Sequence, residues 1–375
     1  MANIVVLGGG FGGATAAEAL AKKLATNHKI TLVSRSQRFV FYPSLVRFAF
    51  GQCEASEIQF DLPEAMLNRR VRFVEGEVAR VDTAARKLTF ARGDFVGDMP
   101  FDYLIIALGR RLRTELITGF YEHAHHLLGV RDAEKFGEAV RAFHKGRALI
   151  GHCAGAKLPV PIFETAFALA KHLTELGERG NCSITVVSHE TLDQMFEVIS
   201  ISDALRPLLA SANIELISDF AIDSINSNSL VSTDGRTLEY DLNMIVPPFG
   251  GPGALVGTDI IDHDGYVRVD KTMRVDGHEG IYAAEDCVNF GGPKMAYMAV
   301  RQAEVAANNV AAALQGKSPV AEYEHDLMLV IDAGDSNSTF VNKDLWRDTP
   351  ANIQHSRFWG WAKRKQGQYW KARHN

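Results

Sequence analysis

The stretch NIVVLGGGFGGATAAEALAKKL, residues 3–24, decides the fold. An apolar run leads into Gly8-x-Gly10-x-x-Gly13 and then into an alanine-rich segment. Gly8 permits a tight turn, Gly10 lets the backbone approach a pyrophosphate, and Gly13 allows close packing of helix on strand. Amides at the start of the helix then face the phosphates, where the helix dipole favours negative charge. The stretch predicts a dinucleotide-binding strand, turn and helix, and the alternative is a glycine-rich turn without a ligand.

The next apolar run, KITLVSRSQ (29–37), ends without the acid that commonly binds a ribose in such folds. Ser34 could hydrogen-bond the ribose instead, and Arg35 could stack on adenine or meet a phosphate. The missing acid disfavours NAD at this turn and leaves FAD open. FAD is also favoured by a β-meander that returns to the sheet at Ala107-Leu108-Gly109 and by a late strand that ends near Asp286.

Composition limits the class of protein. A chain of 375 residues is long enough for two or three domains, and a net charge of −5 argues against nucleic-acid binding. The four cysteines are scattered, so we predict neither a metal site nor a disulfide framework. No apolar window is long enough to span a membrane, and no signal peptide precedes the first strand. We therefore expect a cytoplasmic location.

Several segments together resemble one group of flavoproteins. FDYLIIALG (101–109) and IYAAEDCV (281–288), with the first turn, resemble the flavoproteins that have two dinucleotide-binding domains. Leu108 and Glu285 depart from the threonine and glycine usual there. TLVSRSQRFVFYPSLVRFAFG (31–51), MIVPPFGGPGAL (244–255) and PKMAYMAVRQAEVAANNV (293–310) resemble the sulfide:quinone oxidoreductases, whose relatives include flavocytochrome c sulfide dehydrogenase and type II NADH dehydrogenase.

This resemblance implies an α/β fold with two Rossmann-like FAD/NAD(P)-binding domains, as in glutathione reductase, plus a C-terminal region. Residues 1–112 and 250–316 would form the FAD domain. Residues 113–249 would form a second Rossmann-like domain with a degraded NAD motif. Residues 317–375 would form a membrane or dimer region.

The resemblance also implies FAD as the cofactor. Pro43 is expected against the isoalloxazine ring, Val78 at the adenine and Asp286 at the ribityl chain. Lys294 and Met295 should place backbone amides at the flavin N1/O2 edge, where a helix N-terminus stabilises an anionic reduced flavin. The full set expected on FAD is Gly8, Gly10, Phe11, Gly12, Gly13, Ser34, Arg35, Pro43, Val78, Ala107, Gly109, Asp286, Lys294 and Met295.

The redox cysteines implied by the resemblance are missing. Sulfide:quinone oxidoreductases need them, because a thiolate or disulfide sulfur exchanges with sulfide. Two of the expected positions align with Leu158 and about Val330, and the third falls in YEHAHHLLGV (121–130), which has no cysteine. Cys153 is the remaining candidate nucleophile, and the alternative is a buried structural cysteine.

Two further polar residues complete the predicted catalytic group with Cys153. Glu164 could relay protons at the flavin and quinone site, although a glutamate in a helical first turn would look the same. Lys157 could hold an anionic substrate or the reduced flavin, and the alternative is a solvated loop lysine.

A second nucleotide turn is expected at GHCAGA (151–156), and it is incomplete. It keeps Gly151 and Gly155, but His152 and Cys153 stand where the backbone should approach a pyrophosphate. The following run, SITVVSHE (183–190), supplies an acid only at its end. The pattern disfavours NAD(P)H binding in the usual manner.

The tail SRFWGWAKRKQGQYWKARHN (356–375) mixes aromatic and basic residues with no acid among them. Such segments lie in the headgroup region of anionic membranes. We predict peripheral contact with the inner face of the cell membrane. The alternative is a helix that packs its aromatic side chains on the protein or on a second subunit, as in a homodimer.

These observations predict an FAD-dependent oxidoreductase of the sulfide:quinone type, with a small-molecule donor, sulfur compounds included, and a quinone acceptor. One alternative is an NAD(P)H-dependent flavin dehydrogenase or quinone reductase. A second is a non-catalytic flavin-carrying protein, which would account for the lost cysteines.

Overall fold

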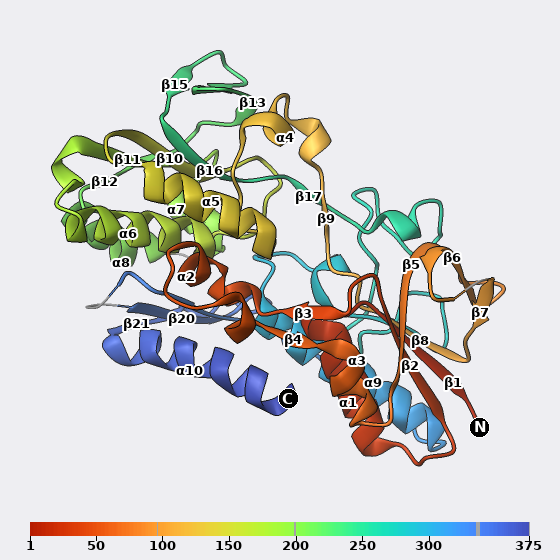
Figure 1. Cartoon of the computed structure of the whole chain (residues 1–375). Coiled ribbons are helices and arrows are strands. Elements are labelled where there is room, and N and C mark those ends of the chain that lie inside the picture. Colours follow the sequence, from red (N-terminus) through yellow and green to blue (C-terminus); the bar gives the residue numbers. More distant parts are fainter. Residues whose placement is uncertain (96, 199, 335–337, 375) are drawn as a thin grey trace.

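The computed structural model describes residues 1–95, 97–198, 200–334 and 338–374. It shows an α/β protein in which both ends of the chain build the lower part of Figure 1 and the middle of the chain builds the upper part. The α/β fold expected from the sequence is confirmed.

The lower part is built on a seven-stranded sheet of order β18-β8-β1-β2-β5-β6-β7. Its five strands from β18 to β5 pair in parallel, and β6 and β7 extend the sheet by antiparallel pairs. Residues 4–7 of β1 are all buried, as expected for a central strand that is covered on both faces. The strands are β1 (Asn3–Leu7), β2 (Lys29–Ser34), β5 (Arg72–Asp82), β6 (Lys87–Gly93), β7 (Asp98–Pro100), β8 (Tyr103–Ile106) and β18 (Ile281–Ala283).

Two long helices pack together against this sheet. They are α1 (Phe11–Lys23) and α9 (Ala296–Leu314), and Figure 1 shows them side by side although they come from opposite ends of the chain. Fully buried alanines, among them Ala17 in α1 and Ala303 in α9, allow the close approach. Helix α1 from the start of the chain therefore lies next to residues 296–314 from its C-terminal half.

The upper part contains a four-stranded parallel sheet of order β12-β11-β10-β16. Helix α6 packs on β10, β11 and β16, and α5 packs on β16. A three-stranded antiparallel sheet, β13-β14-β15, rises above it in Figure 1. The elements are α5 (Val130–Ala142), β10 (Gly146–His152), α6 (Val160–Glu175), β11 (Cys182–Val187), α7 (Leu192–Phe196), α8 (Ile201–Ser211), β12 (Ile214–Ile217), β13 (Ile222–Asn226), β14 (Ser229–Ser232), β15 (Thr237–Glu239) and β16 (Leu242–Val246).

The chain passes between the two parts twice, and the two passages pair with each other. Strand β9 (Arg111–Leu112) leads upward, and β17 (Phe249–Gly250) leads back and pairs with it in antiparallel fashion. The predicted domain boundaries at residues 112/113 and 249/250 fall on this pair. The three-part division itself stays a prediction.

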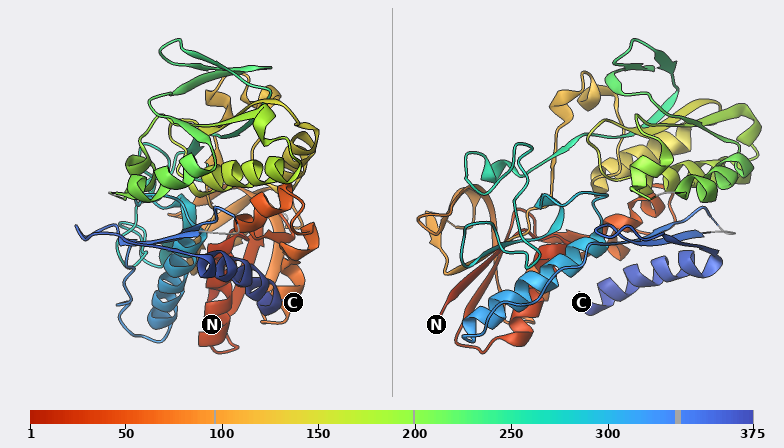
Figure 2. Two further views of the ribbon diagram at one scale, coloured as in Figure 1. Left: turned by 90° about the vertical axis from the view of Figure 1, so that its left-hand side faces the viewer. Right: turned by 180° about the vertical axis from the view of Figure 1, so that it is seen from behind.

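The C-terminal region forms its own antiparallel sheet, β19 (Asp326–Ile331), β20 (Ser338–Asp344) and β21 (Asn352–Ser356), followed by α10 (Arg357–His374). Figure 2 shows α10 running beneath this sheet toward the lower domain. The remaining short elements are β3 (Arg38–Val40), α2 (Leu45–Ala49), β4 (Gln59–Asp61), α3 (Leu62–Leu67) and α4 (Phe120–His123).

Candidate functional site: the first nucleotide turn and its surroundings

The first nucleotide turn has the backbone geometry that its glycines predict. Gly8 has φ +120°, and a Cβ atom on it would lie 1.9 Å from the carbonyl oxygen of Ala107. A Cβ atom on Gly13 would lie 1.7 Å from the carbonyl oxygen of Gly8. Neither position admits a side chain, because backbone atoms cannot move aside locally. Gly8 and Gly13 therefore hold β1, α1 and the end of β8 in close contact.

Glu285 lies at the open side of this turn. A Cβ atom on Gly10 would lie 2.5 Å from Oε1 of Glu285, and one on Gly12 would lie 3.1 Å from Cβ of Glu285. The backbone amides of Phe11 and Gly12 lie close to the Glu285 carboxyl group and act to lower its pKa. Burial, with the charge of Asp286 adding to it, raises the pKa of Glu285 to about 8. Sequence reasoning noted the departure from glycine at residue 285 but missed its consequence.

Phe11 has a structural role in addition to its backbone position. Its ring packs edge-on against Phe39 at 4.9 Å and against Trp370 at 5.0 Å between centroids. The side chain is buried among aromatic rings of the lower domain and the tail. Only the backbone amide of Phe11 therefore faces the turn.

The end of β2 carries the predicted ribose-binding residues. Ser34 is buried, and its hydroxyl donates to the carbonyl oxygen of Ser36 at 2.9 Å. A Cβ atom on Gly9 would lie 2.5 Å from Ser34 Oγ, so this hydroxyl lies against the turn. Arg35 is exposed. The positions agree with a site beside the turn, and their contacts with a ribose stay predictions.

Asp286 pairs with Arg110 in a short ion pair. The Arg110 guanidinium also lies over the ring of Phe249, 4.3 Å from its centroid, so the β9 and β17 passages meet at this residue. Gly109, which precedes Arg110, has φ +67° and open space around it. Asp286 is therefore paired with Arg110, and its predicted contact with the ribityl chain stays a prediction.

The start of α9 is electropositive. Lys294 is buried and its Nζ donates to the carbonyl oxygens of Val288 at 2.8 Å and Phe290 at 3.2 Å. Burial lowers the pKa of Lys294 to about 8, and the charge of nearby Lys157 acts in the same direction. Met295 stands at the N-cap of α9. Two lysines and a helix N-terminus thus lie where an anionic flavin edge was expected.

The structure corrects one detail of that expectation. The backbone amide of Lys294 already donates to the carbonyl oxygen of Lys157 at 2.8 Å, so it is not free for a flavin atom. The bond instead fixes the loop of Lys157 against the start of α9. The role of the Lys157 side chain stays a prediction, and its place beside Lys294 supports an interaction with an anion.

Pro43 and Val78 lie in the lower domain. Pro43 is half-buried in a single 3₁₀ turn, Tyr42–Ser44, just after β3. Val78 is buried in β5 beside an irregular register with β6. Their predicted contacts with the isoalloxazine ring and the adenine remain untested predictions.

Cys153 is placed in an apolar core. It is completely buried beside β10, in a cluster with Phe120, Val187 and Phe220. Burial raises the pKa of its thiol far above the usual range. Because the thiolate is the reactive form, these surroundings weigh against a redox role, which stays a prediction.

Glu164 holds the tail rather than facing open space. Its Oε1 lies 2.5 Å from Nζ of Lys363 and accepts a hydrogen bond from the backbone amide of Asp332 at 2.7 Å. The same Nζ donates to the carbonyl oxygen of Val330 at 3.2 Å. Burial raises the pKa of Glu164, and the Lys363 charge opposes that shift. Glu164 thus joins α6, β19 and α10, and its proposed proton relay stays a prediction.

The second nucleotide turn is rebuilt around His152. In the first turn, three residues separate the end of β1 from the start of α1; here, residues 153–159 separate β10 from α6. Helix α6 begins with Pro159 at its N-cap and Pro161 in its first turn, where a missing N–H costs no helical hydrogen bond. Helix α6 therefore follows β10 only after seven residues, and its two prolines have no amide to donate.

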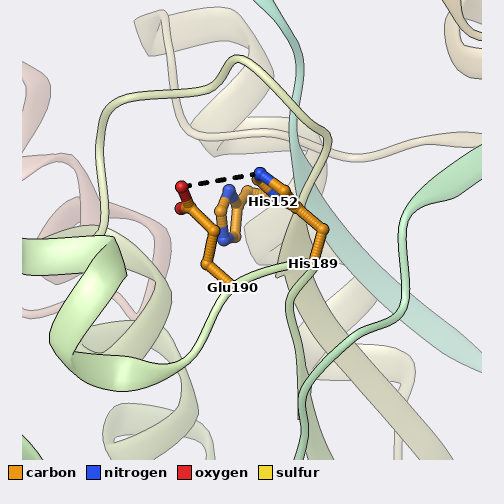
Figure 3. Close-up of side chains that lie close together, drawn as sticks. All are labelled: His152, His189 and Glu190. Carbon is orange, nitrogen blue, oxygen red and sulfur yellow. Dashed lines mark ion pairs between the residues drawn. The ribbon is translucent and has the colours of Figure 1, made fainter.

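Side chains fill the space beside this second turn. His152 is buried and lies 3.0 Å through Nε2 from Ser188 Oγ, and burial lowers its pKa to about 3. Figure 3 shows His152, His189 and Glu190 converging, with the His189–Glu190 ion pair at 3.7 Å. Their ligand-type atoms all lie within 4.8 Å of one another. The three side chains therefore form a compact polar cluster beside the turn.

Comparison with known proteins places the chain in a family. A family model described as pyridine nucleotide-disulphide oxidoreductase matches residues 2–303. The chain belongs to this family. Mouse mitochondrial sulfide:quinone oxidoreductase is 23% identical over 342 residues, covering 86% of this chain and 73% of that protein. Type II NADH:quinone oxidoreductase of Staphylococcus aureus is 22% identical over 350 residues, covering 86% of this chain and 85% of that protein.

Solved structures show the same fold. The sulfide:quinone oxidoreductase of Aquifex aeolicus superposes with a TM-score of 0.91 at 21% identity, over 100% of this chain and 92% of that chain. The NAD-dependent persulfide reductase of A. fulgidus superposes with a TM-score of 0.73 at 20% identity, over 91% of this chain and 64% of that chain. The resemblance drawn from the sequence is confirmed at the level of family and fold.

This member of the pyridine nucleotide-disulphide oxidoreductase family is an FAD-dependent flavin oxidoreductase of the quinone or disulfide type. Its first turn fits the pyrophosphate of FAD, because Gly8 and Gly13 set the backbone and the amides at the start of α1 point to one side. One residue does not fit: the Glu285 carboxyl group lies against the turn, 2.5 Å from where a Cβ atom of Gly10 would be.

Some side chains of the C-terminal tail pack on the rest of this flavoprotein, and others are exposed. Trp370 is buried and stacks on Phe39 at 5.5 Å, and His374 Nε2 lies 2.5 Å from Oε1 of the buried Glu18. By contrast, Phe358, Trp361 and Tyr369 are at least half exposed. Among the described residues, none of the helices has the length and apolar character needed to cross a bilayer.

Proposed function

We propose that the chain passes electrons from a small donor through FAD to a quinone, in the manner of a sulfide:quinone oxidoreductase. Bound FAD would accept an electron pair from the donor and deliver it, with protons, to the quinone. Two relatives, one a sulfide:quinone and one an NADH:quinone oxidoreductase, support a quinone as acceptor. They leave the donor open.

The altered second turn disfavours NAD(P)H as the electron donor. A dinucleotide pyrophosphate needs close backbone approach and amides at a helix start. Here, buried His152 occupies the turn and the seven residues 153–159 separate β10 from α6. His189 and Glu190 crowd the same strand ends, as Figure 3 shows. A small donor does not require this turn, so it fits the chain better.

The residues at the positions expected for redox cysteines indicate how such a donor would react. Leu158 and Val330 occupy two of those positions, and Val330 offers its carbonyl oxygen to Lys363. Cys153 is buried and its thiol is held protonated. The proposal therefore has the donor react at the flavin itself, without a protein disulfide. A sulfur anion such as hydrosulfide is the donor class that we put forward. Two hydrosulfide ions would then join as hydrodisulfide, and the electron pair and one proton released would reduce the flavin.

Two lysines would assist this reaction. Lys157 and Lys294 lie at the start of α9, where positive charge and the helix dipole favour an anionic flavin edge or an incoming anion. The Lys294 ammonium is fixed by two carbonyl oxygens, whereas Lys157 is half-buried in a loop. In the proposal, Lys294 supplies fixed charge and Lys157 meets the anion.

Peripheral membrane contact is part of the proposal, because a quinone substrate resides in the bilayer. Phe358, Trp361 and Tyr369 expose aromatic rings on α10, and Lys365 lies exposed among them. Aromatic and basic side chains together favour the interface of an anionic membrane. Burial of the same rings in a homodimer is the competing proposal.

The acceptor half of the proposal has a direct test. FAD-loaded protein is reduced anaerobically with stoichiometric dithionite and mixed with a soluble short-chain quinone. The proposal expects the oxidised flavin spectrum to return within seconds, with one quinol formed per flavin. A spectrum that stays bleached for minutes would favour the non-catalytic flavin carrier instead.

A further inference from the structure

Glu285 occupies the place that the first nucleotide turn reserves for a phosphate. Its Oε1 lies 2.5 Å from where a Cβ atom of Gly10 would be, so the carboxyl group rests on the face of the turn that lacks side chains. The amides of Phe11 and Gly12 lie close to it and act to lower its pKa, and a Cβ atom on Gly12 would lie 3.5 Å from its Oε2. These are the same amides that the start of a 13-residue helix offers to a pyrophosphate.

The backbone at residue 285 directs the side chain into this place. Glu285 has φ +77°, in the left-handed region that favours glycine. Its backbone amide donates to Gln302 Oε1 at 2.7 Å, which fixes the residue against α9. Glycine would hold this conformation without strain and leave the amides of α1 free. The Glu285 side chain thus adds backbone strain at this position, and its carboxyl group is directed at the amide donors of α1.

We propose that Glu285 is an internal ligand of the α1 amides that the pyrophosphate of FAD must displace, so that the chain holds FAD more loosely than it would with glycine at residue 285. Displacement needs no other residue of the turn to move, because Gly8 and Gly13 are set by backbone contacts. Occupancy by FAD then depends on the cellular FAD concentration. The inference rests on FAD as cofactor and is independent of the donor and the quinone.

The groups around Glu285 show which interactions its carboxylate would lose when a pyrophosphate displaces it. Asp286 and Cys287 follow it in the chain, Arg110 pairs with Asp286, and Tyr42, from the loop after β3, is close enough for its charge and that of Glu285 to interact. Arg110 pairs directly with Asp286 and acts on Glu285 only through its charge, which lowers the pKa of Glu285 less than the Gly12 amide does. The α1 amides are therefore the main stabilising partners of Glu285, and a pyrophosphate competes for the same groups.

The test measures FAD affinity of the full chain directly. Apoprotein of the wild type and of Glu285→Gly is titrated into FAD at pH 8.5, and the quenching of flavin fluorescence gives Kd. We expect Glu285→Gly to bind FAD at least tenfold more tightly, which is about 1.4 kcal/mol. Equal or weaker binding by Glu285→Gly would overturn the proposal.

Two further variants separate displacement from other effects. Glu285→Gln keeps the size of the side chain and removes the charge, and it should bind FAD several-fold more tightly than the wild type. It also decides the question if Glu285→Gly does not fold. Asp219→Gly is the matched control, since Asp219 is an exposed acid at φ +60° in the upper domain. A gain in Asp219→Gly equal to that in Glu285→Gly would assign the effect to general stability and contradict the proposal.

Discussion

The Nζ atom of Lys363 lies 2.5 Å from Oε1 of Glu164, and this buried ion pair ties the tail helix α10 to helix α6 of the upper domain. The same ammonium bonds the carbonyl oxygen of Val330 in β19. Three segments from different parts of the chain therefore meet at one charge pair. The pair also contacts Val330, one of the positions where relatives were expected to carry a redox cysteine.

Removal of Lys363 should destabilise the protein. Lys363→Met leaves the Glu164 carboxylate buried without its partner, and the loss of a partner in a buried pair costs about 3 kcal/mol. Urea denaturation followed by circular dichroism measures the free energy of unfolding. Lys365→Met, on the exposed face of α10, is the control and should change it by no more than about 0.5 kcal/mol. An equal effect of both variants would show that the pair contributes nothing specific.

Glu18 should make the stability of the tail depend on pH. Burial raises the pKa of Glu18, but His374, Arg373 and Arg69 together outweigh burial and hold it below its usual value. The ionised carboxylate therefore stabilises the folded state above about pH 4.5, and this contribution is lost as the pH falls through the lowered pKa.

The measurement compares the wild type with Glu18→Gln from pH 7 to pH 3. The wild type should be the more stable by a constant amount down to about pH 4.5, and the difference should shrink below that. Glu304→Gln, which removes a half-exposed partner of Arg301, is the control and should show no such trend. A difference that grows in acid would contradict the assignment.

The thiols should be almost inert in the native protein. Cys153, Cys182 and Cys287 are buried, and Cys53 is half-buried with a pKa raised by burial. We expect a thiol reagent such as DTNB to modify only Cys53 in the native state and all four cysteines after denaturation.

The flavin of the Cys153→Ser variant should be reduced by the donor at the same rate as the flavin of the wild type. Rapid native labelling of Cys153, or loss of flavin reduction in Cys153→Ser, would restore its redox role.

FAD affinity should fall as the pH rises through the pKa of Glu285. That pKa is about 8 without FAD, and a bound pyrophosphate disfavours the ionised carboxylate further, so binding is linked to proton uptake. The Kd for FAD should therefore increase between pH 7 and pH 9 in the wild type and stay flat in Glu285→Gln. The same slope in both proteins would assign the pH dependence to another group, such as Lys294.

Much of the lower domain could be predicted from local sequence. Gly8 and Gly13 are required by backbone contacts that a β-turn-α pattern implies, and the structure shows those contacts. The late start of α6 could be anticipated from Pro159 and Pro161, although its extent could not. Local spacing is informative at such positions because the contacts lie within a single supersecondary unit.

Other features depend on contacts that no local pattern reports. The Glu164–Lys363 pair joins residues 199 positions apart, so neither residue alone indicates a partner. Glu285 was visible as a departure from glycine, but its direction depends on a positive φ and on the approach of α1 from the other end of the chain. Packing between distant parts of the chain determines both the Glu164–Lys363 pair and the direction of the Glu285 side chain.

The most direct test of the proposed function is anaerobic reduction of the FAD-loaded protein in a stopped-flow spectrophotometer. Separate mixes contain hydrosulfide, NADH or NADPH, and flavin absorbance reports reduction. The account predicts that hydrosulfide bleaches the flavin, that a short-chain quinone restores it, and that neither NADH nor NADPH bleaches it over minutes. Bleaching by NADH or NADPH within seconds would contradict it, because the second turn would then bind the dinucleotide that His152 is argued to exclude.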